Sequence, residues 1–107
     1  MQSIEVSELA AVMADPAHQP WQLLDVREPW ELATAKIPQA VAISMQQIVQ
    51  RYTELDPDKI TFCLCHHGTR SMQVGYFLER QGFASVVNVA GGIDAWSRQV
   101  DETIPLY

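Results

Sequence analysis

Positive charge is scarce in this sequence, which holds 7 Lys and Arg against 13 Asp and Glu residues, for a formal net charge of −6. The basic residues are scattered and form no stripe that neutralises phosphates, so no binding to nucleic acid is expected. Nothing approaches the roughly 18 consecutive apolar residues of a membrane span. The N-terminus also lacks a basic start followed by an apolar run, so no signal peptide is predicted. We therefore expect a cytoplasmic protein that binds no membrane.

Cysteine and histidine are also few, and their spacing limits what they can form. The chain has 2 cysteines, Cys63 and Cys65, and 3 histidines. A disulfide across so short a spacing fits an extended strand poorly, so two free thiols are expected, which suits a reducing compartment. Zinc usually takes ligands from two separated places. Because His18 lies far from His66 and His67 and no second Cys/His pair exists, we predict no metal and no other cofactor.

The 107 residues show no internal repeat, low-complexity segment or linker, so one domain over 1–107 is predicted. Short apolar runs predict strands at Trp21–Val26, Val41–Ile43, Ile60–Leu64 and Ser85–Val89. Helical spacing predicts helices over Glu8–Ala14, Pro29 to about Thr34, Ser44 to about Tyr52, Ser71–Gln81 and a short segment after Gly92. This alternation indicates an α/β domain with a largely parallel sheet that is covered on both faces.

Local signals predict the helix ends and the core. Ser7 is the expected N-cap of the first helix, Ser44 and Gln47 match a capping box, and Gly82 is the expected stop of the longest helix. Cys63 is expected in the core, with a reach toward the base of the cysteine loop as the alternative. The other expected core residues are Met13, Val26, Ile43, Val74, Phe77, Leu78, Val87 and Trp96.

The segment Cys65-His66-His67-Gly68-Thr69-Arg70 joins a predicted strand to a predicted helix. In a parallel α/β sheet, functional groups gather beyond the carboxyl ends of the strands. The N-terminus of the following helix supplies unpaired N–H groups and the positive end of the helix dipole, which together bind anions. That field favours the thiolate of Cys65, the reactive form. We therefore predict a small cradle around a sulfur anion, with space for an anionic ligand.

The other residues of this loop have expected roles. Gly68 lets the backbone turn back toward the sulfur without steric cost, and Arg70 adds positive charge. His66 and His67 are expected either at the loop mouth, where protonation below neutral pH would attract anionic donors, or as plain surface residues.

The sequence resembles a known family at several places. Cys65–Ser71 resembles the C-x-x-G-x-R-S active-site loop of the rhodanese family of sulfurtransferases, and LDVREPWE at Leu24–Glu31 is similar to its DVRE-x-x-E segment. Lys36–Val41 stands where the family usually shows GHIPGA, and Gly91–Trp96 resembles its GG-x-x-x-W ending. These blocks follow the family order and together span roughly Ile4–Trp96. The resemblance implies a rhodanese-like fold, with a central parallel five-stranded sheet and helices on both faces.

This sequence departs from the family pattern at Ala35-Lys36, which replace the usual Gly-His, and at Gln39, which replaces the second glycine. Both positions lie away from the cysteine in the family, so little effect on the chemistry is expected.

The resemblance also implies an enzyme of the thiosulfate sulfurtransferase type. The Cys65 thiolate would attack the sulfane sulfur of thiosulfate or of a persulfide donor and carry it as a persulfide. Cyanide, a thiol or a cysteine of a sulfur-relay protein would then accept that sulfur in a ping-pong sequence. Backbone N–H groups of His66–Ser71, among them those of Gly68 and Thr69, would hold the sulfur.

The resemblance suggests roles for the charged residues. Arg70 would donate charge-assisted hydrogen bonds to thiosulfate oxygens, or attract the anion from a distance. Asp25 and Arg27 are expected to be structural, in ion pairs with Arg70 and Glu28 that fix the loop.

Two other functions stay open. A domain that only docks to a partner and carries sulfur would keep Cys65 without thiosulfate turnover. Phosphatases and arsenate reductases of related fold use a C-x5-R loop, with one more residue between cysteine and arginine. Because four residues separate Cys65 from Arg70, the cradle should fit sulfur better than phosphate.

Overall fold

The computed structural model describes residues 1–107 and contains one sheet of five strands. The strands are β1 (Gln2–Ile4), β2 (Trp21–Asp25), β3 (Val41–Ala42), β4 (Ile60–Leu64) and β5 (Ser85–Val89). They pair in the order β1-β5-β4-β2-β3, and every pair is parallel. The helices are α1 (Val6–Ala14), α2 (Pro29–Thr34), α3 (Ile48–Arg51), α4 (Thr69–Arg80) and α5 (Gly92–Gln99), with a 3₁₀ helix, η1, at Tyr52–Glu54.

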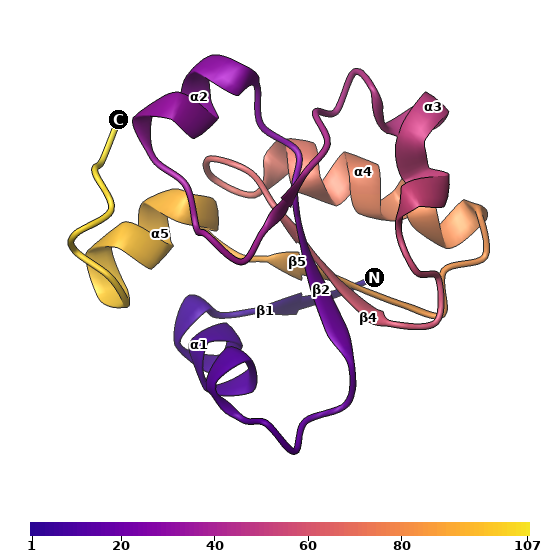
Figure 1. The fold of residues 1–107 in the computed structure, drawn as a ribbon, viewed down its shortest axis with the longest axis horizontal. Helices are drawn as coiled ribbons and strands as arrows, with labels where there is room; N and C mark the ends of the chain where they lie inside the picture. Colours follow the sequence, from indigo (N-terminus) through magenta and orange to yellow (C-terminus); the bar gives the residue numbers. More distant parts are fainter.

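Helices cover both faces of this sheet (Figure 1), with α1 and α5 on one side and α3 and α4 on the other. Successive side chains of a strand point to opposite faces. In β4, Phe62 and Leu64 therefore join the cluster beneath α1 and α5, while Cys63 joins the cluster beneath α4. This double burial explains why the strands read as nearly continuous apolar runs. The predicted α/β fold, with a central parallel five-stranded sheet, is confirmed.

The structure adds one strand that the residue pattern did not predict. β1 pairs with β5 through its backbone, with Gln2 opposite Val87 and Ile4 opposite Val89. Gln2 and Ser3 are exposed, and only Ile4 is partly buried. A strand this short and polar shows no alternation of apolar and polar residues, so only its backbone pairing with β5 identifies it.

Two predicted helix starts are wrong. α1 begins at Val6 after Glu5, and Ser7 lies inside it as an exposed residue. α3 begins at Ile48, not at Ser44. The reason for the later start is that the chain still pairs with β2 beyond β3: the Ile43 amide donates to the Asp25 carbonyl, and the Met45 amide donates to the Val26 carbonyl. Residues held in this extended ladder cannot begin a helix.

The predicted core is largely confirmed. Val26, Ile43, Val74, Leu78 and Val87 are buried, as are Cys63 and Trp96. Met13 and Phe77 are only partly buried and lie at the edges of the two clusters. Phe77 packs edge-on against Tyr52, with 5.4 Å between the ring centroids.

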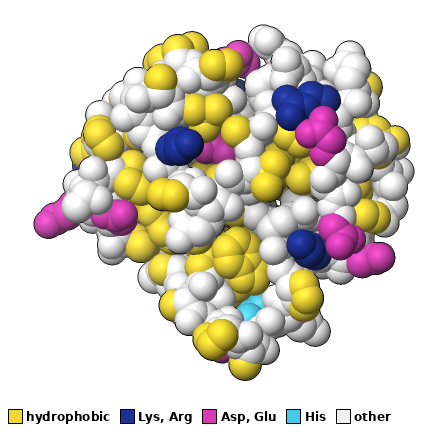
Figure 2. Space-filling view, viewed as in Figure 1, with side chains coloured by type: hydrophobic (Ala, Val, Ile, Leu, Met, Phe, Trp, Pro, Cys, Tyr) yellow, Lys and Arg dark blue, Asp and Glu magenta, His cyan; other side chains and the backbone are white.

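The face seen in Figure 1 carries both acidic and basic side chains. Figure 2 shows basic side chains there in small, separate groups beside acidic ones, with no continuous basic patch. None of the helices has the length and apolar character that crossing a bilayer requires.

Leu78 provides a test of the packing beneath α4. Its side chain is 0% exposed, whereas Tyr76 on the same helix is 48% exposed. We expect Leu78→Ala to lower the free energy of unfolding by about 2–4 kcal/mol, because it leaves a cavity in a packed core. Tyr76→Ala should change it by less than about 1 kcal/mol. Urea unfolding followed by circular dichroism measures both, and equal losses would contradict the described packing.

Candidate functional site

The candidate site lies at the carboxyl end of β4, the middle strand of the sheet. Cys65 follows β4 directly, and the loop His66–Gly68 leads into α4. Gly68 stands at the N-cap of α4 with φ 115°. Only glycine adopts such a backbone conformation without strain, so Gly68 is what permits the tight return of the chain toward the sulfur.

Two groups contact the sulfur of Cys65. The Gly68 amide donates to Sγ at 3.1 Å, and the Ser71 hydroxyl oxygen lies 3.3 Å from Sγ. The backbone amides of His66, His67 and Thr69 donate no hydrogen bond within the protein. Amides without a partner at the start of a helix are donors that can stabilise a nearby negative charge.

The N-terminus of α5 holds the other side of this loop. The Ile93 amide donates to the Cys65 carbonyl at 2.9 Å, and the Asp94 amide donates to the His66 carbonyl at 3.1 Å. A side chain at Gly92 would overlap both carbonyl groups, and its φ of 60° is also in the left-handed region. The paired glycines before α5 therefore allow the helix to approach closely enough to bind the loop.

Asn88, in β5, is a site residue that the sequence analysis missed. Its Nδ2 donates to the Gly68 carbonyl at 3.0 Å, and its Oδ1 accepts from the Ser71 hydroxyl at 2.6 Å. Asn88 thus holds both groups that contact the sulfur of Cys65. The available signal was a polar amide between the valines of a predicted strand, where a buried polar group needs a hydrogen-bond partner.

Arg70 does not make the ion pairs that the sequence analysis expected. Both of its terminal nitrogens bind the carboxylate of Glu31 in α2, at 2.6 and 2.9 Å. These hydrogen bonds lower the pKa of Glu31 to about 2, against the opposing effect of burial. They also raise the pKa of Arg70. Glu31 lies in the DVREPWE stretch, and its distance from the loop in sequence hid this pairing.

Asp25 and Arg27 form a buried ion pair with each other, as a structural role requires. The Arg27 Nη2 lies 2.7 Å from Asp25 Oδ2, and both side chains are fully buried. Burial opposes the charge of Arg27, but hydrogen bonds to Asp25 and Tyr107 outweigh it and raise its pKa. The expected pairing with Glu28 is wrong, because the Glu28 side chain instead forms a capping box with Glu31 at the start of α2.

Tyr107 connects these charged residues to the loop. Its hydroxyl donates to Glu31 Oε2 at 2.6 Å and accepts from Arg27 Nη1 at 3.0 Å. Burial and the bond to Glu31 raise the pKa of Tyr107 to about 12, so the phenol stays protonated. Its ring stacks on that of His66, with 3.9 Å between centroids and 6° between planes.

The two histidines differ in their surroundings. The His66 ring lies between those of Tyr107 and His67, each with its centroid 3.9 Å away. Burial away from water lowers the pKa of His66, and the neighbouring His67 lowers it further. His66 is therefore neutral at pH 7. His67 is exposed at the loop surface. Of the two, only His67 is exposed to solvent.

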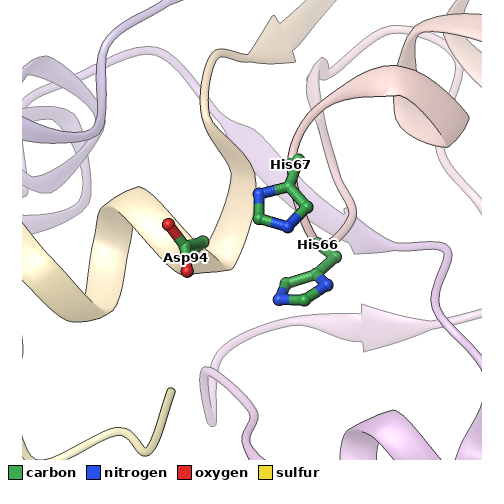
Figure 3. Close-up of side chains that lie close together, drawn as sticks. All are labelled: His66, His67 and Asp94. Atoms are coloured by element: carbon green, nitrogen blue, oxygen red, sulfur yellow. The ribbon is translucent and has the colours of Figure 1, made fainter. Parts of the chain in front are cut away.

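The cluster of His66, His67 and Asp94 (Figure 3) raises the question of a metal. One donor atom from each residue lies within 4.8 Å of the others. A nitrogen lone pair lies in the plane of its ring, so the two imidazoles, only 31° from parallel, do not aim at one point. Asp94 also accepts a hydrogen bond from Arg98 at 3.0 Å. The arrangement therefore does not fit a bound ion as it stands, and the absence of a metal stays a prediction.

The cradle is tighter than predicted. Cys65 is only 1% exposed and lines none of the surface hollows of the molecule. The expected space for a ligand above the sulfur is therefore not open in this geometry.

Cys63 provides a test of which thiol reacts. Burial raises the pKa of Cys63 to about 12, and the residue is fully buried. In a Cys65→Ser variant we expect the folded protein to resist iodoacetamide at pH 8, and to react fully once unfolded in urea. Rapid alkylation of the folded variant would mean that Cys63 reaches the loop instead of the core.

The pH dependence of stability tests the pairing of Glu31 with Arg70. Because its folded pKa of about 2 lies below the ordinary 4.5, its contribution to stability is complete above pH 4.5 and is lost as the pH falls toward 2. This contribution has a slope of up to about 1.4 kcal/mol per pH unit. We expect the difference in unfolding free energy between wild type and Glu31→Gln to shrink over that range. Glu102→Gln, the same change at an exposed position, is the matched control.

Comparisons with known proteins agree with this fold. Residues 5–99 match the family model described as Rhodanese-like domain. Rhodanese-like/PpiC domain-containing protein 12 of Arabidopsis thaliana, a chloroplastic protein, is 43% identical over 112 residues, which cover 100% of this chain and 38% of that protein. Thiosulfate sulfurtransferase GlpE of Vibrio cholerae is 32% identical over 96 residues, 89% of this chain and 87% of that one.

Solved structures of rhodanese-like proteins have the same fold as this chain. The rhodanese-like domain protein of Staphylococcus aureus has a TM-score of 0.84 and 34% identity, covering 100% of this chain and 99% of that chain. A rhodanese-related protein of Thermoplasma volcanium has a TM-score of 0.85 and 29% identity, with both chains covered completely. The architecture, the cysteine loop and the family match agree, and this chain belongs to the rhodanese-like domain family.

Proposed function

We propose that this protein is a sulfurtransferase that carries a sulfane sulfur on Cys65 and passes it to a thiophilic acceptor. The observation that carries this proposal is the pair of contacts to Sγ, from the Gly68 amide at 3.1 Å and the Ser71 hydroxyl at 3.3 Å, beneath a loop with unpartnered amides. Relatives named as sulfurtransferases, from Allochromatium vinosum at 40% identity and Vibrio cholerae at 32%, support it.

The reaction has two steps. In the first, the Cys65 thiolate attacks the outer sulfur of thiosulfate or of a persulfide; the donor S–S bond breaks, and its electron pair leaves with sulfite or with a thiolate. Cys65 then carries a persulfide. In the second, cyanide, a small thiol or the cysteine of a relay protein attacks the outer sulfur, and the Cys65 thiolate is regenerated. No external oxidant or reductant is needed, because sulfur moves between two nucleophiles.

The loop residues have separate roles in this proposal. The amides of His66, His67 and Thr69 would bind the terminal sulfur of the persulfide, which carries the negative charge. The Gly68 amide donates to Sγ itself, and Asn88 positions both Gly68 and Ser71 beside it. Such preorganised donors are the largest contribution that a protein makes to stabilising developing charge.

A second function, sulfur carriage without turnover of small donors, is favoured by one relative. YrkF of Bacillus subtilis, whose name refers to a sulfur carrier protein, is 34% identical over 79 residues. A carrier would need the same Cys65 loop but would receive its sulfur from another protein. Turnover rates with small donors separate the two functions.

The test of sulfur transfer is the intact mass of reduced protein after incubation with thiosulfate or with glutathione persulfide. We expect the protein to gain one sulfur atom and to lose it on addition of cyanide, with thiocyanate formed in equal amount. Cys65→Ser should gain nothing, while Cys63→Ser should behave like the wild type. Absence of any mass gain with both donors, or a gain in Cys65→Ser, would refute the proposal.

A further inference from the structure

We infer that this site selects persulfide donors over thiosulfate, because Glu31 neutralises the one arginine of the cysteine loop. This inference rests on the proposed sulfur transfer at Cys65 and names the class of donor. The ion pairs around the loop determine how much positive charge a ligand meets there.

Arg70 is not free to bind an anion. Its Nη1 and Nη2 each bind one oxygen of Glu31, at 2.6 and 2.9 Å, in the two-pronged geometry that is strongest for a guanidinium and a carboxylate. Glu31 is 2% exposed, and Tyr107 and the Glu28 amide also donate hydrogen bonds to its carboxylate. A donor that recruited Arg70 would leave this buried carboxylate without its counter-charge, which is costly.

The other charges beside the loop are paired as well. Arg27 is buried against Asp25, and Arg98 binds Asp94 at the start of α5. Together with Arg70 and Glu31, these are three cations and three anions, which sum to zero.

The arginines near the loop therefore add no net positive charge. His66 is neutral at pH 7 because desolvation, and then the neighbouring His67, lower its pKa. Attraction for an anion is therefore left to the backbone amides, within a protein whose formal net charge is −6. Long-range charge thus opposes a dianion such as thiosulfate more strongly than a donor with less negative charge.

The two donor classes make different demands on this loop. Thiosulfate is a dianion, and transfer of its sulfur to the Cys65 thiolate releases sulfite, also a dianion, at the loop mouth. Attack on a protonated persulfide RSSH breaks its S–S bond, leaves Cys65–SSH and releases RS⁻, so only one negative charge develops on the leaving group. A loop whose one arginine is already paired suits the second reaction better.

The rim of the site also suits an organic donor. Trp30 is 65% exposed, and its ring packs edge-on against Tyr107, with 6.0 Å between centroids. Tyr107 in turn stacks on His66. These aromatic rings offer contact to the carbon part of a thiol persulfide, whereas sulfite has no apolar part to bury.

The experiment measures kcat/KM of the full chain for thiosulfate and for glutathione persulfide, with cyanide as acceptor. We expect the wild type to prefer glutathione persulfide. In Glu31→Gln, which keeps the shape of the side chain but uncovers the charge of Arg70, the ratio of thiosulfate to persulfide kcat/KM should rise by on the order of tenfold, as expected for one cation a few Å from a dianion.

Two control variants isolate the charge of Arg70. Glu79→Gln also removes one negative charge, but Glu79 lies nine residues after Arg70 in α4, roughly 13 Å away. This variant should leave the donor ratio unchanged. The double variant Glu31→Gln/Arg70→Gln should lose the gain in thiosulfate use.

A measurement on the wild type alone covers the case in which Glu31→Gln does not fold. Added salt screens repulsion between the acidic protein and a dianion. We therefore expect kcat/KM for thiosulfate, a dianion, to rise between low salt and 0.5 M NaCl. That for glutathione persulfide, which carries one net negative charge when its SSH group is protonated, should rise less.

The outcomes separate this inference from the proposed function. Equal use of both donors by the wild type, or an unchanged ratio in folded Glu31→Gln, would overturn donor selection while sulfur still appears on Cys65. Absence of sulfur on Cys65 with either donor would instead overturn the sulfurtransferase proposal, and the inference with it.

Discussion

The buried guanidinium of Arg27 is the group on which the rest of the site depends. It is fully buried, so each of its N–H groups needs a partner inside the protein. It binds the carboxylate of Asp25 at the end of β2, the carbonyl of Ala35 after α2, and the hydroxyl of Tyr107. One side chain thereby fixes the end of a strand, a helix and the C-terminal segment. Removing a partner from such a buried charge typically costs about 3–5 kcal/mol.

From this anchor, the hydrogen bonds continue to the cysteine loop. Tyr107, held by Arg27, donates to Glu31, and Glu31 binds Arg70 at the start of α4. On the other side of the loop, the first amides of α5 bind the carbonyls of Cys65 and His66. The loop is therefore held on both sides, which keeps its amides near the sulfur without the help of a ligand.

The same contacts explain why the site is rich in ions but low in net charge. A charge buried beside the loop must be paired, so each arginine that shapes the loop brings its own carboxylate. The groups left without a partner beside the sulfur are backbone N–H groups. The pairing of buried charge thus both stabilises the loop and sets the charge that a ligand would meet there.

The sequence by itself determined the parallel α/β fold, the position of Cys65 after a buried strand, and the burial of Cys63. These follow from apolar periodicity and from glycine and helix-start signals, which act between residues a few positions apart. It did not reveal β1, whose polar residues are held only by backbone pairing with β5, or the late start of α3, which β2 delays through its own hydrogen bonds. Tertiary structure alone decided that Arg70 binds Glu31, that Asn88 holds Gly68 and Ser71, and that Tyr107 stacks on His66. Those partners lie between 17 and 41 residues apart in the chain, and no local spacing encodes which of many charged or polar groups will meet across such a distance.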